Sequence, residues 1–163
     1  MRFFTSEWAR GEDHDHDPVS QYQRFLDTLD PASPVHQFVM SVNLNDAILD
    51  RAVYDSMQKS LQLFLITGDL QVGYWSTEIN YVDAEINGRI VLSDALDDRR
   101  SEILYDEFSL EGNGFLHQFL LVPKTRRKTE DQEFGIRFSS FSYRQRSINE
   151  RAVTALENVS VWR

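Results

Sequence analysis

The strongest candidate for acid–base chemistry in this chain of 163 residues is His117, with Asp106 and Glu107 upstream of it. An imidazole can act as a general base when a neighbouring carboxylate orients it. The turn sequence GNG at residues 112–114 predicts a hairpin between these groups, and a tight register would place Asp106 roughly opposite His117 or beyond it. His117 with Asp106 or Glu107 would then serve a small-ligand-binding or hydrolytic site. No nucleophile motif accompanies them, which favours the alternative of a partly buried histidine bonded to the backbone.

Alternating carboxylates and imidazoles fill residues 13–17, which read DHDHD. His14 and His16 would share one side of an extended segment, which makes them weak candidate ligands for Zn²⁺ or Ni²⁺. A functional metal site needs ligands on rigid elements, and the flanking sequence predicts none. We therefore expect a solvated acidic loop that ends in a helix cap at Asp17, with neither a metal nor another cofactor.

Aromatic residues are abundant in the segments that resemble strands and make up 12% of the chain. Tyr74, Trp75 and Tyr81 lie in the long apolar segment at residues 61–86. Tyrosine and tryptophan are enriched at binding hot spots, so these three are the candidate contact residues wherever they reach the surface. Core packing is the alternative for most of the aromatic side chains.

The chain is acidic, with a formal net charge of −9 and a pI near 4.8. A nucleic-acid surface needs clustered Lys and Arg, and the one basic run, at residues 124–128, is soon followed by Glu130 and Asp131, which weaken its field. An acidic surface instead attracts a basic protein partner through its field, although acidity also serves solubility alone. A long edge strand could pair with its twin, so a homodimer is the other expected assembly.

The chain contains no cysteine, which excludes disulfides and cysteine-based metal sites and is typical of the reducing cytosol. The N-terminus lacks the apolar core of a secretion signal, and no apolar run approaches the ~18 residues of a membrane-spanning helix. We therefore expect a cytoplasmic protein that neither spans a membrane nor binds nucleic acid. No Pro- or Gly-rich linker divides the chain, so residues 1–163 are expected to form one domain.

Two short helices are predicted before the sheet. Asp-Pro at residues 17–18 and Ser-Pro at residues 33–34 each combine an N-cap residue with proline at the first helical position. Apolar residues then recur at helical spacing over residues 18–29 and residues 35–42. A short C-terminal helix is expected after Ser147, which has capping-box spacing.

About six to eight mainly antiparallel strands, arranged as a hairpin meander, are expected to complete an α+β fold. The strand-like segments are residues 48–54, 61–66, 70–81, 82–86, 89–92, 103–110, 115–122 and 134–143. Two-residue turns are predicted at Gly68-Asp69 and at Asn87-Gly88. A change of apolar phase predicts a bulge near Gly73, and a second change predicts a kink at residues 139–140. A further short helix is expected to begin at Ser93.

Three blocks carry a family resemblance: MRFFTSEW at residues 1–8, GDLQVGYWSTEINYVDAEI at residues 68–86 and EILYDEFSLEGNGFLHQFLLVP at residues 102–123. They resemble an uncharacterised bacterial family whose members begin with Met-basic-aromatic-Phe-Thr-x-Glu and carry a GD-x-Q-x-GY sheet segment. That family has no assigned activity, so the resemblance implies a fold and no chemistry. Its members often have a His-Asp pair before the first sheet strand, where this chain has Asn45-Asp46.

The size, acidity and layout are also similar to those of small immunity proteins from bacterial toxin systems, which act by binding a toxin. The phosphate-binding and catalytic patterns GxGxxG, GxxxxGK[ST], HExxH and GxSxG do not occur in the chain. The sequence therefore favours a non-enzymatic, protein-binding module, with neutralisation of a basic toxin as its concrete form. The alternative is a small-ligand-binding or hydrolytic domain that uses His117 with Asp106 or Glu107.

Overall fold

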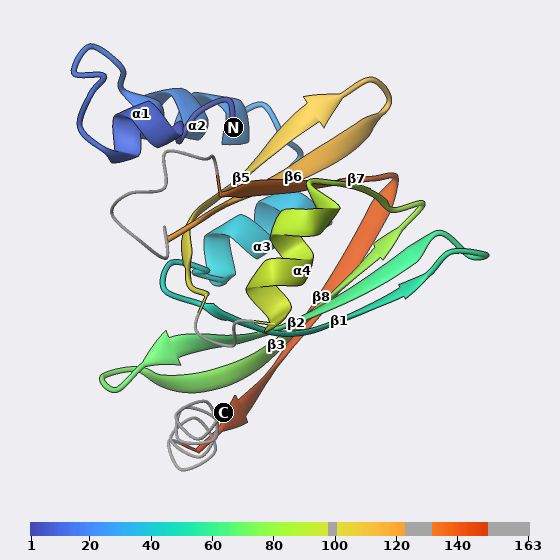
Figure 1. The fold of residues 1–163 in the computed structure, drawn as a ribbon. Helices are drawn as coiled ribbons and strands as arrows, with labels where there is room; N and C mark the ends of the chain where they lie inside the picture. The colour runs from blue at the N-terminus through green and yellow to red at the C-terminus, as the bar shows by residue number, and fades with distance from the viewer. Residues whose placement is uncertain (98–100, 123–131, 150–163) are drawn as a thin grey trace.

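The computed structural model describes residues 1–97, 101–122 and 132–149. Within these residues the chain forms four helices and eight strands, and every strand pair is antiparallel (Figure 1). The predicted α+β class is confirmed. The helices are α1 (Ser6–Ala9), α2 (Pro18–Leu26), α3 (Pro34–Ser41) and α4 (Arg89–Asp97). The strands are β1 (Ile48–Asp55), β2 (Ser60–Asp69), β3 (Gly73–Val82), β4 (Glu85–Asn87), β5 (Ile103–Glu111), β6 (Gly114–Leu121), β7 (Glu133–Phe138) and β8 (Ser140–Ile148).

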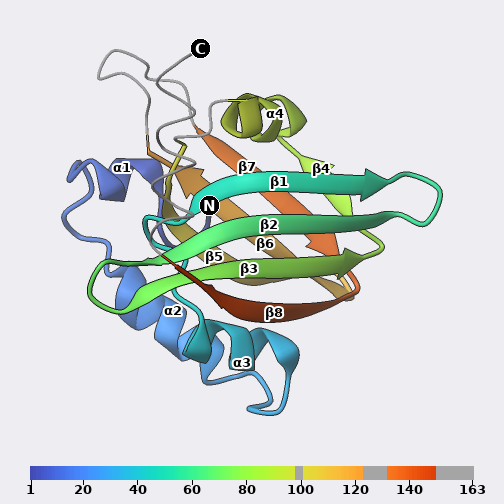
Figure 2. The same ribbon diagram turned by 90° about the horizontal axis from the view of Figure 1, so that it is seen from below.

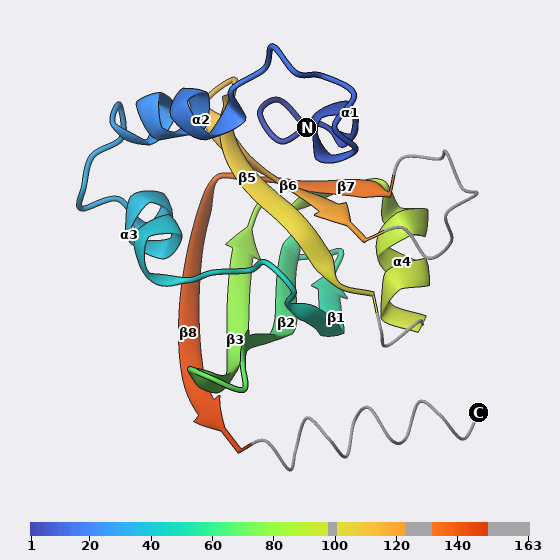
Figure 3. The same cartoon turned by 90° about the vertical axis from the view of Figure 1, so that its left-hand side faces the viewer.

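The strands divide into two four-stranded sheets instead of forming one meander. The first sheet has the order β1-β2-β3-β8 and the second the order β4-β7-β6-β5. Figure 2 shows the first sheet face on, and Figure 3 shows its strands crossing those of the second sheet. Helices α3 and α4 close two opposite sides between the sheets, whereas α1 and α2 lie on the outer side of the second sheet (Figure 3).

The core lies between the two sheets. One cluster of buried apolar side chains joins both sheets to α3 and α4, and its members include Phe38 of α3, Leu63 of β2, Leu92 of α4 and Phe119 of β6. A smaller cluster attaches α2 and the N-terminal segment to the outer side and consists of Phe3, Tyr22 and Leu26. Burying a Leu or Phe side chain stabilises a fold by about 1.5–3 kcal/mol, so the layer between the sheets dominates the packing.

The two predicted N-terminal helices are confirmed as α2 and α3. Asp17 accepts a hydrogen bond from the N–H of Ser20, and Ser33 accepts one from the N–H of His36. Both caps precede a proline at the start of the helix, as the sequence indicates. A further short helix, α1, begins after Thr5, whose side chain accepts the N–H of Trp8.

The β2–β3 hairpin turns later than the predicted two-residue turn at Gly68. Asp69 pairs with Gly73, so the loop consists of the three residues between them. The Asp69 carboxylate fixes this loop by accepting hydrogen bonds from the N–H groups of Gln71 and Val72. The apolar loop residues Leu70 and Val72 are exposed. The predicted change of apolar phase near Gly73 arises because these two residues belong to the loop and not to a strand. The predicted bulge is therefore wrong, since β3 keeps one register along its whole length.

The second predicted hairpin, at Gly88, is also wrong. Gly88 has a φ of 72° and follows β4, and α4 begins at Arg89 where a strand was predicted. Leu92 and Ala95 are three residues apart and both are buried, so the apolar residues here form a helical face. This helix starts four residues before the predicted start at Ser93. β4 pairs instead with β7 of the second sheet.

The third hairpin is confirmed, whereas the kink predicted within one strand at residues 139–140 is a passage between two strands of different sheets. Gly112 and Asn113 join β5 to β6, and at Ser139 the chain passes from β7 in the second sheet to β8 in the first. The capping box predicted at Ser147 is wrong, because Ser147 belongs to β8 and pairs with Trp75. The remainder of the predicted C-terminal helix and the basic run at residues 124–128 lie outside the described residues. Across the ranges that the structure describes, no helix has the length and apolarity to cross a membrane.

Candidate functional site

Three hydrogen-bonding side chains form a chain that crosses the core. The Nε2 atom of His117 in β6 lies 2.9 Å from Oδ2 of Asp106 in β5, and its Nδ1 atom lies 2.8 Å from the Tyr81 hydroxyl of β3. A carboxylate only accepts hydrogen bonds, so the neutral ring carries its hydrogen on Nε2 and accepts the Tyr81 O–H at Nδ1. The structure thus brings the predicted pair of His117 and Asp106 together and adds Tyr81 to it.

The register of the β5–β6 hairpin explains this pairing. Phe108 lies directly opposite His117, and Asp106 lies two residues further along on the same face of β5, opposite Phe119. The imidazole centroid is 3.8 Å from that of Phe108 and 4.1 Å from that of Phe119. Aromatic rings therefore pack against the histidine and keep it in a fixed position between the sheets.

Burial sets the protonation states of His117 and Tyr81. His117 is 0% exposed and Tyr81 is 1% exposed. Burial lowers the pKa of His117, and the hydrogen bond and negative charge of Asp106 only partly oppose this shift. Burial also raises the pKa of the Tyr81 hydroxyl well above its usual value. The imidazole is therefore neutral at neutral pH, and its contact with Asp106 is a hydrogen bond and not an ion pair.

Glu107 does not join this group. Neighbouring residues of a strand point to opposite faces, and the Glu107 side chain points to the outer side of β5, where it is fully buried. Its carboxylate accepts hydrogen bonds from the backbone N–H groups of Arg2, Phe3 and Phe4, the last two at 2.9 and 2.8 Å. Glu107 therefore holds the N-terminal segment on the sheet, and of the two predicted carboxylates only Asp106 meets His117.

Of these three hydrogen-bonded side chains, Asp106 is the one that reaches the surface, with 17% of its side chain exposed. It lies in an open depression of about 490 Å³ at β5, an edge strand of the second sheet. This feature, the Asp106 depression, is bounded by α1 and α2 on one side and by residues 42–45 on the other. Its lining includes Asp106, Phe4, Trp8, Tyr22 and Tyr105.

Three rings pack together as one wall of the Asp106 depression. Phe4 stacks on Tyr105 with centroids 5.3 Å apart, and Trp8 meets Tyr105 edge-on at 5.3 Å. The face of an aromatic ring attracts cations, and the Asp106 carboxylate does the same. The surrounding sequence adds to this field, since residues 1–30 carry seven carboxylates and three arginines. The depression therefore favours a cationic group and disfavours an anion.

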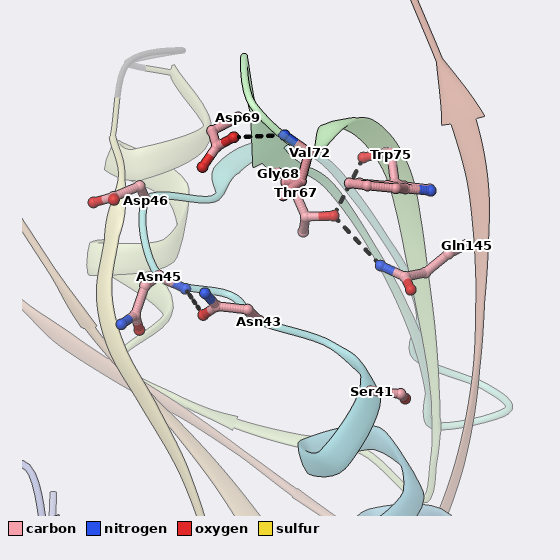
Figure 4. A pocket seen from close by; sticks show the side chains of 10 residues that line it. All are labelled: Ser41, Asn43, Asn45, Asp46, Thr67, Gly68, Asp69, Val72, Trp75 and Gln145. Carbon is pink, nitrogen blue, oxygen red and sulfur yellow. Dashed lines mark hydrogen bonds between the residues drawn. The ribbon is translucent and has the colours of Figure 1, made fainter.

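The three predicted contact residues occupy different places. Tyr81 lies in the core, where no partner can reach it. Tyr74 is half-buried on the outer face of the first sheet, because it alternates with the inward-facing Trp75 along β3. Trp75 is also half-buried, and it lines a second pocket of about 260 Å³ (Figure 4). Only Tyr74 and Trp75 therefore have surface to offer a ligand or a partner.

One of the two histidines of the acidic loop, His16, has a structural contact. His16 donates from Nε2 to the carbonyl oxygen of Phe3 at 2.7 Å, which fastens the loop to the N-terminal segment. His14 is exposed, and Asp17 caps α2 as the sequence predicts. Within the described ranges, no three His, Asp or Glu side chains lie close enough to hold a metal ion.

Comparison with protein-family models, with curated proteins and with solved structures gives no match. The family resemblance of the three sequence blocks stays a prediction.

Sequence reasoning missed the aromatic wall of the Asp106 depression. Phe4 and Trp8 are four residues apart, and a helix capped at Thr5 would place them near each other, so this part was within reach of the sequence. Their contact with Tyr105 was not, because it depends on the attachment of the N-terminal segment to Glu107, about one hundred residues away in the chain. No local pattern signals such a contact.

Proposed function

We propose that this protein is a non-catalytic binding module that recognises a basic segment of a partner protein, with one lysine or arginine side chain of the partner seated in the Asp106 depression. The observation that carries the proposal is the Asp106 carboxylate, held by buried His117 at an aromatic wall. Neutralisation of a basic toxin, as immunity proteins perform it, is the concrete form of this role.

The Asp106 depression offers a cationic side chain two attractions. A guanidinium or ammonium group can make a charge-assisted hydrogen bond with Asp106, and its charge and methylene groups can pack on the rings of Trp8 and Tyr105. His117 already holds one oxygen of the carboxylate. Asp106 is thus ordered before the partner arrives, which reduces the entropy lost on binding.

The charge of the whole chain supports the same class of partner. A net charge of −9 raises the rate at which a basic protein meets this one, and salt weakens that attraction. The carboxylates of residues 1–30 lie in the part of the chain that includes α1 and α2, which border the depression. Overall and local charge therefore favour the same partner.

A hydrolytic role for His117 has less support. A general base must come within hydrogen-bonding distance of the proton that it removes. The His117 ring is fully buried, and both of its nitrogens are occupied by Asp106 and Tyr81. A substrate in the depression would meet Asp106 and not the imidazole, so binding is the better-supported use of this arrangement.

The test is the affinity of the whole protein for short fluorescent peptides of alternating Gly and Arg, Gly and Lys, or Gly and Glu, measured by fluorescence anisotropy. The basic peptides should bind and the acidic peptide should not. Asp106→Asn should weaken binding by about tenfold or more. Asparagine keeps an oxygen that can accept the His117 N–H, so the variant removes charge while preserving the internal hydrogen bond.

Two further variants separate a specific site from general acidity. Asp50→Asn removes one exposed charge from β1, away from the depression, and should change the affinity by less than about twofold. Trp8→Ala removes a ring while leaving the Asp106–His117 contact, and it should weaken binding about threefold or more. Equal effects of Asp106→Asn and Asp50→Asn, or binding of the acidic peptide, would overturn the proposal.

A further inference from the structure

We propose that the basic segment of the partner binds at the Asp106 depression in an extended conformation and adds a short strand to the outer edge of β5. This inference rests on the proposed function and specifies the backbone conformation of the bound segment. The observation that carries it is the set of main-chain hydrogen bonds along this edge, which leaves the N–H and C=O groups of Asp106 unpaired within the described residues.

The direction of the backbone groups in β5 opens this edge to a ligand. β5 is an edge strand, so β6 pairs with only one of its sides. The Phe108 N–H donates to the Tyr22 hydroxyl of α2 at 2.9 Å and therefore points away from β6. In an antiparallel pair, residues that bond to the partner strand alternate with residues that face the outer edge. The register is regular between Tyr105 and Glu111, so the N–H and C=O of Asp106 also point to the outer edge.

The edge is already occupied on both sides of Asp106. On one side, the Ile103 C=O accepts the N–H of Asp46 at 2.8 Å, and the Ile103 N–H donates to the carbonyl oxygen of Ala47 at 2.9 Å. On the other side, the N–H of Phe108 is bonded to α2. Between these positions, the main-chain groups of Asp106 have no hydrogen-bond partner in the part of the chain that the structure describes. The Asp106 depression lies at this gap.

The length of the gap favours a short strand. At about 3.3 Å per residue, the strand from Ile103 to Phe108 provides about 16 Å of edge, which accommodates about three extended residues. The long edge strand of a second copy would meet Tyr22 at one end and residues 46–47 at the other. This edge therefore disfavours pairing between two copies and accepts a short extended segment.

Strand addition places a basic side chain beside the Asp106 carboxylate. Two residues that exchange both main-chain hydrogen bonds in an antiparallel pair lie directly opposite each other, with their side chains on the same face of the sheet. An arginine or lysine opposite Asp106 therefore brings its charge to the carboxylate that His117 orients. One residue of the partner thus meets both the backbone and the side chain of Asp106.

The experiment measures the affinity of the whole protein for the peptide acetyl-Gly-Thr-Arg-Thr-Gly-amide by NMR titration. Its single arginine fixes the register, and threonine favours an extended backbone. N-methylation of the arginine nitrogen removes the N–H that would donate to the C=O of Asp106, and it should weaken binding about tenfold or more. N-methylation of the threonine after the arginine is the matched control. Alternate N–H groups of an added strand point away from β5, so this change should alter the affinity by less than about threefold.

Amide hydrogen exchange gives a second measurement on the protein itself. Saturation with the unmethylated peptide should slow exchange of the Asp106 amide about tenfold or more, because its N–H gains an acceptor. Leu110 is the matched control. Its N–H faces the same edge of β5, but Leu110 does not line the depression. Exchange of the Leu110 amide should therefore change by less than about twofold.

Equal affinities of the two methylated peptides would overturn strand addition, and so would unchanged exchange of the Asp106 amide when the peptide is bound. Either result would leave the proposed function intact if Asp106→Asn still weakens binding of the unmethylated peptide. Failure of the unmethylated peptide to bind would instead overturn the proposed function and this inference together.

Discussion

The Tyr81 hydroxyl lies 2.8 Å from Nδ1 of His117, and this contact joins the two sheets through the middle of the core. Tyr81 belongs to β3 and His117 to β6, so the hydrogen bond spans the layer in which most of the apolar side chains are buried. A buried polar group without a partner destabilises a fold, and here each group satisfies the other. The same bond orients the imidazole so that Nε2 meets Asp106. The order of the surface carboxylate thus depends on the packing of the core.

Tyr81→Phe should therefore be costly although the ring remains. The substitution leaves the Nδ1 atom of His117 as a buried acceptor with no donor, which should lower the free energy of unfolding by about 1–3 kcal/mol. Urea unfolding followed by tryptophan fluorescence measures this loss. Tyr143→Phe is the matched control, because its hydroxyl meets Ser41 at an exposed position at 2.9 Å, and it should cost about 0.5 kcal/mol or less. Equal losses in both variants would contradict the assigned role of Tyr81.

The stability of the protein should fall as the pH decreases from about 7 to 5. Burial lowers the pKa of His117 in the folded state, whereas an unfolded histidine titrates near pH 6.5. Below about pH 6.5 the unfolded chain binds a proton that the folded chain does not, so stability declines by up to about 1.4 kcal/mol per pH unit. Urea unfolding at a series of pH values measures the slope. His117→Gln should flatten it, and parallel slopes in the two proteins would count against the prediction.

The elements with a local signal were predictable from the sequence. The Asp-Pro and Ser-Pro pairs begin α2 and α3, and the GNG turn at residues 112–114 joins β5 to β6. The change of apolar phase at Ser139 marks the point where β7 ends and β8 begins. The sequence could not show that the two strands belong to different sheets, because a kink within one sheet gives the same apolar pattern. Gly88 illustrates the opposite case. A strand turn and a helix start can both use its positive φ, and only burial of Leu92 and Ala95 in the core decides between them.

The candidate site was predictable to the same extent. The hairpin alone brings Asp106 near His117, since both belong to one local unit. Tyr81 joins this hydrogen-bonded group from the other sheet, and no sequence pattern within β3 distinguishes this buried tyrosine from a surface contact residue. Local reasoning left Asp106 and Glu107 as alternatives. Adjacent residues in a strand face opposite ways, and the three backbone donors to Glu107 come from the far end of the chain. Long-range contacts of this kind follow from the packing of whole elements.

Glu107→Gln should loosen the N-terminal segment. Glutamine offers one acceptor oxygen where the carboxylate offers two, and its NH₂ group would face the backbone N–H groups of residues 2–4. We expect the free energy of unfolding to fall by about 2–3 kcal/mol. Hydrogen exchange should also be faster at the Phe3 and Phe4 amides. The exchange rates of amides in β2 and β3 should change only as far as the free energy of global unfolding changes. Unchanged exchange at Phe3 and Phe4 would show that Glu107 does not anchor this segment.

Gly68→Ala should be among the most damaging single substitutions in the first sheet. Gly68 has a φ of 91°, and an added Cβ atom would lie 2.1 Å from the carbonyl oxygen of Gly73 and 2.8 Å from the Trp75 ring. The hairpin end must shift or the ring must move, which should cost about 3 kcal/mol or more and change the fluorescence of Trp75. Gly112→Ala is the control, since its φ is 60° but nothing lies within 4 Å of the added atom. Backbone strain alone should cost it about 1 kcal/mol. Equal losses on urea unfolding would mean that strain, and not the close approach of Gly73 and Trp75, sets the requirement for glycine at position 68.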